Sequence, residues 1–415
     1  MSSWQRTFTA VWIANFLSGL GMMSFLPFFP SLLEQMGLTE RGEIELWSGL
    51  CFGAAPLMAA LMGPVWGSLG DRFGRKPMVL RSLLAITVFV GAMALARTPL
   101  ELFLLRLLQG TFSGILPPSL TLVSAGAPSE RQGSLAGRMQ MGMASGAILG
   151  PALGGWAAAV LDLNAIFLAV ALIVGLGALA VAIVAEEPNL PRVGPGVSWG
   201  TFSLLKGVWG DFKSLLAVPA MQPTLAVLFC VQFGIGATNP VLELFVRDLV
   251  AEPGLTVAGW QLERAQLTGL LFSTTAVLHV VGMPKWGRRG DQKGHLGTLF
   301  LSAGGVSLSL LLCGLAPLYG VLLLGRFALG FSAAGTGPTA FGVAAVSVAE
   351  ENRGAANGAV FSARALALAL SSMLGGALAA VVGVRGLFFA GAVAVGLAVA
   401  GGWLLSRRRS ARGLA

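Results

Sequence analysis

Long apolar stretches alternate with short polar segments along almost the whole chain. Each apolar stretch has about 20 residues, the length at which an α-helix crosses the hydrocarbon core of a bilayer. The pattern therefore predicts an all-α integral membrane fold with twelve transmembrane helices. In the tenth stretch, the helix is expected to end near Pro338. The predicted spans are 8–30, 47–69, 78–97, 101–124, 140–160, 165–185, 222–246, 266–284, 296–315, 317–346, 365–382 and 384–405.

A polar segment between the sixth and seventh stretches divides the pattern into two parts. It contains Pro188, Pro191 and Pro195, which break regular structure. We expect an N-terminal six-helix bundle, a cytoplasmic linker, and a C-terminal six-helix bundle with a basic tail. Part of the linker, from Trp199 to Leu216, is predicted to form an amphipathic helix on the membrane surface. The three regions are 1–185, 186–220 and 221–415.

One motif occurs twice, 220 residues apart. Residues Pro64 to Gly74 and residues Pro284 to Gly294 share Pro, Trp, Gly, Gly, Asp and Gly at the same offsets. The repeat extends to the fourth and tenth spans and, at an offset of 221, to the fifth and eleventh. A repeat in which both copies run in the same direction predicts two pseudo-symmetric halves of parallel topology. The further pairs are Arg106 with Arg326, Gly110 with Gly330, and Gly154-Gly155 with Gly375-Gly376.

The composition supports a membrane protein. Hydrophobic residues make up 55% of the chain and charged residues 11%, and the mean hydropathy is +0.80. Soluble domains carry roughly 25% charged residues, so the bilayer is the expected solvent. The net charge of +9 comes from short inter-helix loops and the tail, without a basic stripe that aromatic residues interrupt. We therefore expect no nucleic-acid partner.

The distribution of basic residues predicts the orientation. With the N-terminus in the cytoplasm, twenty Lys and Arg residues fall on the cytoplasmic side and five on the other side. Such a bias is typical of cytoplasmic loops. The sequence thus predicts a multi-pass protein of the cytoplasmic (inner) membrane with both termini in the cytoplasm.

The segment from Gly67 to Leu80 resembles the loop 2–3 signature of the major facilitator superfamily. The glycines permit a tight turn, and the basic residues anchor the loop on the cytoplasmic side. Asp71 is able to cap the next helix or to pair with basic neighbours. In this family the motif acts as a gate between the two halves. The resemblance implies a gating role for Gly67, Gly70, Asp71, Arg72, Gly74, Arg75, Lys76 and the pseudo-symmetric Asp291.

The fifth span resembles the antiporter signature of the drug:proton antiporter branch of the same family. Small residues at every fourth position make a flat face for close helix packing, and a proline kinks the helix. These residues are Gly146, Gly150, Pro151, Gly154 and Gly155. Shorter matches at 25–30, 47–49 and 239–240 are similar to exporters of the MdtG type. The resemblance implies secondary active export of lipophilic or amphipathic compounds by proton antiport and alternating access.

Proton coupling requires a titratable group inside the membrane. Glu243 is one candidate, and a salt bridge to Arg247 is the structural alternative. His279 is another, with an interhelical contact as its alternative. Arg106, followed by Gln109, either tunes a carboxylate or substrate electrostatically or holds helices together near Glu101. The expected polar groups of the substrate cavity are Asn15, Gln140, Gln232 and Asn239.

No nucleotide-binding loop and no catalytic metal or nucleophile motif occurs in the sequence, so no enzyme activity is expected. No cofactor and no metal site is predicted. The expected partners are the lipid bilayer, protons and a small lipophilic or amphipathic substrate, with the chain as a monomer. Two alternatives remain open. One is a gradient-driven facilitator or importer of a small metabolite, and the other is a non-transporting membrane scaffold or sensor.

Overall fold

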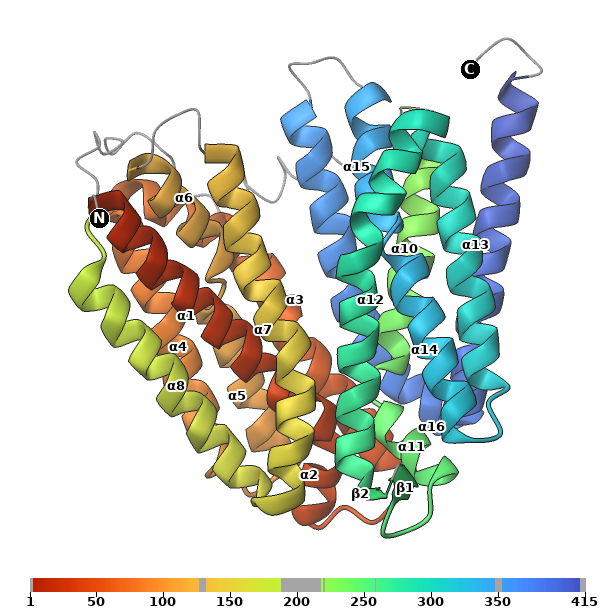
Figure 1. The fold of residues 1–415 in the computed structure, drawn as a ribbon, viewed down its shortest axis with the longest axis horizontal. Helices are drawn as coiled ribbons and strands as arrows, with labels where there is room; N and C mark the ends of the chain where they lie inside the picture. The colour runs from red at the N-terminus through yellow and green to blue at the C-terminus, as the bar shows by residue number, and fades with distance from the viewer. Residues whose placement is uncertain are drawn as a thin grey trace. The chain divides into compact units, whose positions relative to one another are not determined.

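The structure is a computed structural model and is almost entirely helical (Figure 1). It describes residues 3–126, 132–187, 218, 221–257, 259–347 and 353–410. Most of the predicted linker, including its amphipathic helix, lies outside these residues. Within the described helices, some residues are described by their backbone only. These residues are 64, 68, 71, 72, 132–133, 353–359, 361–362 and 408–410.

Helices of bilayer-spanning length follow one another along the chain. The elements up to the linker are α1 (Ser3–Phe25), η1 (Leu26–Phe28), α2 (Phe29–Gln35), α3 (Arg41–Phe73), α4 (Arg75–Met93), α5 (Pro99–Phe112), α6 (Leu116–Gly126), α7 (Gln132–Val160) and α8 (Leu163–Val184). Those after it are α10 (Met221–Thr238), α11 (Leu242–Leu249), the antiparallel hairpin β1 (Leu255–Val257) and β2 (Trp260–Leu262), α12 (Arg264–Lys293), α13 (His295–Gly314), α14 (Tyr319–Ala333), α15 (Thr336–Ser347) and α16 (Arg353–Ser410).

The predicted passes all have helical counterparts. Ten segments of the described chain are long and apolar enough to cross a membrane. One of them, Ala363–Arg407, has 45 residues, about twice the length that a bilayer requires. It breaks at Gly383, whose φ is 72°, and so holds two passes. The shorter helices α5 and α6 together supply the remaining pass, because each alone is below spanning length.

Several passes are interrupted rather than continuous. The first breaks at Pro27, and the seventh breaks between Thr238 and Leu242. The prediction that the tenth helix ends near Pro338 is wrong. Instead, the break lies at Ala334 and Gly335, and Pro338 is the third residue of α15. Proline fits this first turn because its missing N–H would have no partner within the helix there.

The chain forms two compact units that exchange one short segment each. Unit 1 comprises residues 1–38, 54–201 and 265–273, and unit 2 comprises residues 39–53, 202–264 and 274–415. The first turns of α3 therefore pack in unit 2 and its remainder in unit 1. The reverse holds for α12, whose first turns pack in unit 1. This exchange places two helices in both units.

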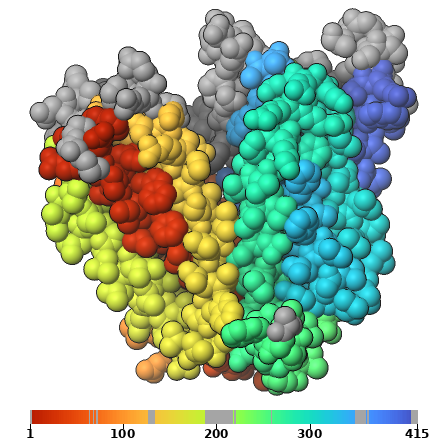
Figure 2. All heavy atoms as spheres, viewed as in Figure 1, coloured from red at the N-terminus to blue at the C-terminus, as the bar shows by residue number. Residues whose placement is uncertain are grey.

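Within unit 1, α1 packs against α7 and α8, and α8 also packs against α4. In Figures 1 and 2, α8 lies beside α1 at the edge of the unit. Phe167 and Val174 of α8 are buried, whereas Leu168, Leu172 and Leu176 are exposed. An exposed apolar face on a helix of mean hydropathy 2.9 is the surface expected to face lipid. In unit 2, α10 packs along α16, and α13 packs against α14 and α16.

Candidate functional site

The predicted gate loop is a sharp junction between α3 and α4. Gly74 has a φ of 104°, a left-handed value that favours glycine. The first amides of α4 donate to one carboxylate, Arg75 N to Glu187 Oε1 at 2.8 Å and Lys76 N to Oε2 at 2.6 Å. Lys76 Nζ also donates to the carbonyl of Ala182 at 2.8 Å. The carboxylate thus occupies the positive end of the helix, an arrangement that stabilises its N-terminus.

The sequence prediction missed Glu187, which lies 112 residues from Arg75 and carries no local motif. A Cβ at Gly74 would lie 3.0 Å from Glu187 Oε1, so the glycine also leaves room for this cap. The side chains of Asp71 and Arg72 fall outside the described ones. Their gating role, with that of Gly67, Gly70, Arg75 and Lys76, therefore stays a prediction.

The second copy of the motif preserves the turn but differs at its end. Gly294 has a φ of 90°, and open space surrounds the position of a Cβ there. Asp291 lies on the exposed surface, 3.7 Å from His295 Nε2. The tryptophans of the two copies behave alike. Trp66 Nε1 donates to the carbonyl of Thr111 at 2.6 Å, and Trp286 Nε1 donates to that of Phe331 at 2.7 Å.

The antiporter motif brings the backbones of α7 and α1 into contact. A Cβ at Gly146 would lie 2.1 Å from the carbonyl oxygen of Phe16, and one at Gly154 would lie 1.9 Å from that of Ser24. Gly150 makes the same approach to the carbonyl of Leu20, with a corresponding distance of 2.5 Å. Glycine is required at all three positions, because a side chain would overlap the main chain of α1. Small residues four apart allow such contact between membrane helices.

A second face of the same motif packs against the first turns of α12. A Cβ at Gly155 would lie 2.6 Å from the carbonyl oxygen of Ala265, and one at Gly269 would lie 2.2 Å from that of Pro151. Ser273 Oγ donates to the carbonyl of Ile148 at 2.6 Å and accepts from the amide of Ala152 at 3.1 Å. These two groups bond to each other in a regular helix. The hydroxyl therefore bridges one step of the α7 ladder beside Pro151, a recognised cause of helix bending.

Unit 2 contains the pseudo-symmetric contacts, at the offsets predicted from the sequence. Gly49 of α3 lies against the carbonyl of Ser372, and Gly376 lies against the carbonyl of Glu45. Gly53 approaches the carbonyl of Ala369, which corresponds to Ile148. The internal repeat thus extends from residue identities to individual backbone contacts. Only the second half carries a hydroxyl at this position, because Gly53 corresponds to Ser273.

The repeated arginines are both buried, each with only 1% of its surface exposed. Arg106 donates from Nη1 to Gln109 Oε1 on the same helix, and its guanidinium lies 5.6 Å from the ring centroid of Phe29. Arg326 of α14 connects to α12 and to the break between α10 and α11, because Nε donates to Thr275 Oγ1 at 3.1 Å and Nη2 donates to Asn239 Oδ1 at 3.2 Å. The contacts of Arg326 link separate segments of unit 2, whereas the hydrogen bond of Arg106 to Gln109 stays within α5. The role of Arg106 stays a prediction.

The remaining predicted polar residues are spread over both units. Glu243 is buried, 4% exposed, and forms an ion pair with Arg247 Nη2 at 3.0 Å. Asn15 is fully buried and donates to Ser119 Oγ at 2.8 Å. His279 is half-buried and hydrogen-bonds to the backbone of Gly330. Gln232 is half-buried, and Gln140 is exposed on α7. Of the predicted set, the structure brings together Arg106 and Gln109, and Asn239 contacts Arg326, the repeat partner of Arg106.

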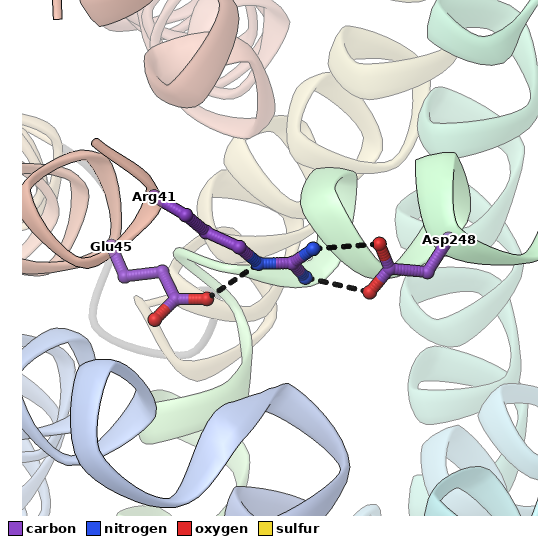
Figure 3. Close-up of polar contacts among 3 residues, drawn as sticks. All are labelled: Arg41, Glu45 and Asp248. Carbon is purple, nitrogen blue, oxygen red and sulfur yellow. Dashed lines mark hydrogen bonds and ion pairs between the residues drawn. The ribbon is translucent and has the colours of Figure 1, made fainter. Parts of the chain in front are cut away.

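A charged cluster in unit 2 was not predicted (Figure 3). Arg41 at the start of α3 donates two parallel hydrogen bonds to Asp248 of α11, of 2.8 Å from Nη1 and 2.6 Å from Nη2. Its Nε donates to Glu45 at 3.1 Å, and Glu45 is only 3% exposed. The i, i+4 spacing of Arg41 and Glu45 was a readable signal. The predicted span began after both residues, so it left them in a loop.

Comparison with known proteins identifies the architecture. The family model of the Major Facilitator Superfamily matches residues 11–262 and 224–414. The chain belongs to the Major Facilitator Superfamily. As expected for this family, it is a multi-pass membrane transporter and not an enzyme.

Curated relatives of this superfamily chain include drug exporters. The multidrug resistance protein MdtG of Salmonella paratyphi A is 31% identical over 292 residues, covering 70% of this chain and 68% of that protein. The multi-drug resistance efflux pump PmrA of Streptococcus pneumoniae is 29% identical, covering 83% and 81%. The staphyloferrin B transporter of Staphylococcus aureus is 29% identical, covering 73% and 69%.

Solved structures share the fold at low sequence identity. The nucleoside transporter NupG gives a TM-score of 0.74 at 13% identity, covering 96% of this chain and 99% of that one. The human organic anion transporter MFSD10 gives a TM-score of 0.69 at 20% identity, covering 98% and 100%. The similarity to these structures establishes the fold, whereas the exporters establish a family of small-molecule transporters.

Proposed function

We propose that this transporter exports lipophilic or amphipathic compounds from the cell in exchange for protons, by alternating access. Two of the curated relatives named above are multidrug exporters. The antiporter motif of α7 supports the same direction of transport, because it resembles the signature of exporters that work by exchange. The observation that carries the proposal is the reciprocal exchange, in which α3 and α12 each take part in both units.

The exchanged segments suit a transporter that alternates between two states. Their contacts include close approaches of glycine to backbone, as at Gly49 and Gly269. Flat contacts of this kind separate and re-form without side-chain rearrangement. In alternating access, the first turns of α3 would leave unit 2 in one state and return in the other. The bend would fall near Gly53 in α3 and near Ser273 in α12, where the units divide.

Proton coupling is assigned to buried carboxylates of unit 2. Glu243 and Glu45 are both buried, and each is paired with an arginine one turn away. Protonation of either carboxylate removes an ion pair and leaves the arginine free to take another partner. For Glu45 that arginine is Arg41, which also holds Asp248. A proton at Glu45 would thereby weaken the attachment of α3 to α11.

The test uses purified protein in proteoliposomes loaded with a fluorescent lipophilic cation. With the wild type, an imposed pH gradient should accelerate flux in the antiport direction, and a reversed gradient should slow it. Glu243→Gln and Glu45→Gln should transport at a rate that no longer depends on the gradient. Glu43→Gln is the matched control for Glu45→Gln, because Glu43 lies exposed on α3, the helix that carries Glu45.

If the rate of flux in the wild type does not depend on the pH gradient, the result would contradict antiport. It would favour a facilitator driven by the gradient of its substrate. Binding of the dye without flux under any gradient would favour a scaffold or sensor. If the flux of Glu243→Gln depends on the pH gradient as fully as that of the wild type, Glu243 has no part in coupling. The same criterion applies to Glu45→Gln.

A further inference from the structure

An apolar groove on unit 1 contains one cationic group among its described side chains, and this group is half-buried. The groove has a volume of about 660 Å³ and runs along α4 to the end of α5. Leu80, Leu84, Val88, Phe89 and Phe112 provide apolar walls. Leu84 and Val88 are more than half exposed, so the groove opens to the surroundings of the helix. Because α4 is a membrane span, those surroundings are expected to be lipid.

The cation is Arg81, which lines the groove from the first half of α4. Its guanidinium stacks 3.8 Å from the ring centroid of Trp66. Nη2 donates to Ser82 Oγ at 2.9 Å, and Nη1 lies 3.6 Å from Met78 Sδ. Nε is buried without a hydrogen-bond partner, and no carboxylate among the described side chains pairs with Arg81. A guanidinium within a membrane span normally meets a partner of opposite charge.

The fold does not require this arginine. At the equivalent place in unit 2, Trp286 of α12 donates to a carbonyl of α14, as Trp66 of α3 donates to one of α5, and both tryptophans make a tilted contact with a phenylalanine ring. The residue that corresponds to Arg81 there is Leu301, an exposed apolar side chain. The tryptophan packing is therefore complete without a cation. The charge is an addition to one half only, which points to a ligand rather than to a structural role.

We propose that this groove binds an anionic phospholipid, with the phosphate at Arg81 and one acyl chain along Leu84 and Val88. Arg81 lies about 9 Å along α4 from Arg75, near the predicted cytoplasmic boundary of the membrane. Arg75 and Lys76 add positive charge at the same end of the helix. Anionic headgroups accumulate in the cytoplasmic leaflet, and basic pockets between helices on that side recognise them. The apolar walls below Arg81 match the hydrocarbon of the same molecule.

The test measures lipid binding and is independent of the proposed transport function. Purified full-length protein in mild detergent is mixed with phosphatidylglycerol or with phosphatidylcholine of the same acyl chains, and native mass spectrometry counts the bound lipids. The wild type should retain phosphatidylglycerol preferentially. Arg81→Leu, which reproduces Leu301, should lower this retention about tenfold, to the level of phosphatidylcholine. Arg81→Lys should retain most of the preference.

Two further variants make the result specific. Arg138→Leu is the matched control, because Arg138 also stacks on a ring of unit 1, that of Phe8 at 4.9 Å, yet lies outside the groove. It should bind lipid as the wild type does. Leu84→Trp should fill the groove and reduce retention of both lipids.

Equal retention of the two lipids by the wild type would overturn the proposal. So would unchanged phosphatidylglycerol binding by Arg81→Leu or Leu84→Trp. Displacement of phosphatidylglycerol by a neutral amphipathic alcohol at equal concentration would assign the groove to a different occupant and would also overturn it. The melting temperature of each variant identifies any loss of binding that comes from unfolding. If Arg81→Leu is unfolded, Arg81→Lys replaces it in the test, and loss of the preference for phosphatidylglycerol in folded Arg81→Lys would overturn the proposal.

Discussion

The hydroxyl of Ser273 donates to the carbonyl of Ile148 at 2.6 Å and thereby ties α12 to the antiporter motif of α7. Replacement of Ser273 by Ala should leave two backbone groups of α7 without this bridge. Hydrogen bonds between membrane helices contribute about 0.6 kcal/mol on average and up to about 1.7 kcal/mol. We expect a loss of stability in this range, measured by thermal unfolding in detergent.

Ser273→Thr keeps the hydroxyl and serves as the control. Ser273→Gly reproduces Gly53 of the other half and should resemble Ser273→Ala. Equal stability of Ser273→Ala and the wild type would show that the bridge contributes nothing.

Gly154 is the position of α7 least tolerant of a side chain. A Cβ there would lie 1.9 Å from the carbonyl oxygen of Ser24, which is part of the α1 backbone and has no rotamer with which to move away. Gly154→Ala should therefore push α1 from α7 and destabilise the protein by about 1–3 kcal/mol, as overpacking does. Gly137 lies on the same helix with open space around its Cβ position, so Gly137→Ala should be neutral or slightly stabilising. The difference between the two melting temperatures measures the helix contact, and similar values would refute it.

The pair of Arg41 and Asp248 should affect transport more than stability. Both side chains are partly exposed, so solvent screens the pair, and Asp248→Asn should cost about 1 kcal/mol or less in unfolding. Its effect on transport should be larger if α3 leaves unit 2 during the cycle, because the pair then breaks once per turnover. We expect Asp248→Asn to shift the balance of states, measured as altered cysteine accessibility on α3. Raising the salt concentration should reduce the difference from the wild type, whereas a salt-independent difference would contradict an ion-pair mechanism.

The two glycine turns allow the cap at α4 to be separated from backbone strain. Gly74→Ala and Gly294→Ala both place alanine at a positive φ with an extended ψ, a conformation almost confined to glycine, which costs roughly 1–3 kcal/mol. Only the first also crowds Glu187, so Gly74→Ala should destabilise more. Glu187→Gln should lower stability by about 1 kcal/mol, because the cap loses its charge. Thermal unfolding of the three variants gives the comparison, and equal losses at both glycines would argue against the cap.

Much of the fold could be predicted from the sequence. Hydropathy gave the number of passes because lipid requires each to be an apolar helix of fixed length. The 220-residue offset predicted parallel halves, and contacts such as that of Gly376 with Glu45 confirm the register at the level of single atoms. The end of the tenth helix was predicted wrongly, because proline breaks a helix interior but fits a first turn, and only tertiary structure decides where Pro338 lies.

The site was less predictable. Glu187, Ser273 and Asp248 act through residues that are more than a hundred positions away in the sequence, and no local pattern connects them. Glu45 was missed for a different reason. A window that averages hydropathy excludes charged residues at the start of a helix, so the predicted span began after Glu45. The pairing of Glu243 with Arg247, by contrast, followed from their i, i+4 spacing.

The exchange of segments also has a consequence for how the molecule is made. Residues 39–53 are synthesised with the first half of the chain, yet they complete the packing of unit 2. Conversely, residues 265–273 belong to the second half and complete unit 1. Neither half of the polypeptide therefore contains all the surface that its own unit buries. The halves depend on each other during assembly in the membrane, and unit 1 reaches its final packing only after the ribosome has passed residue 273.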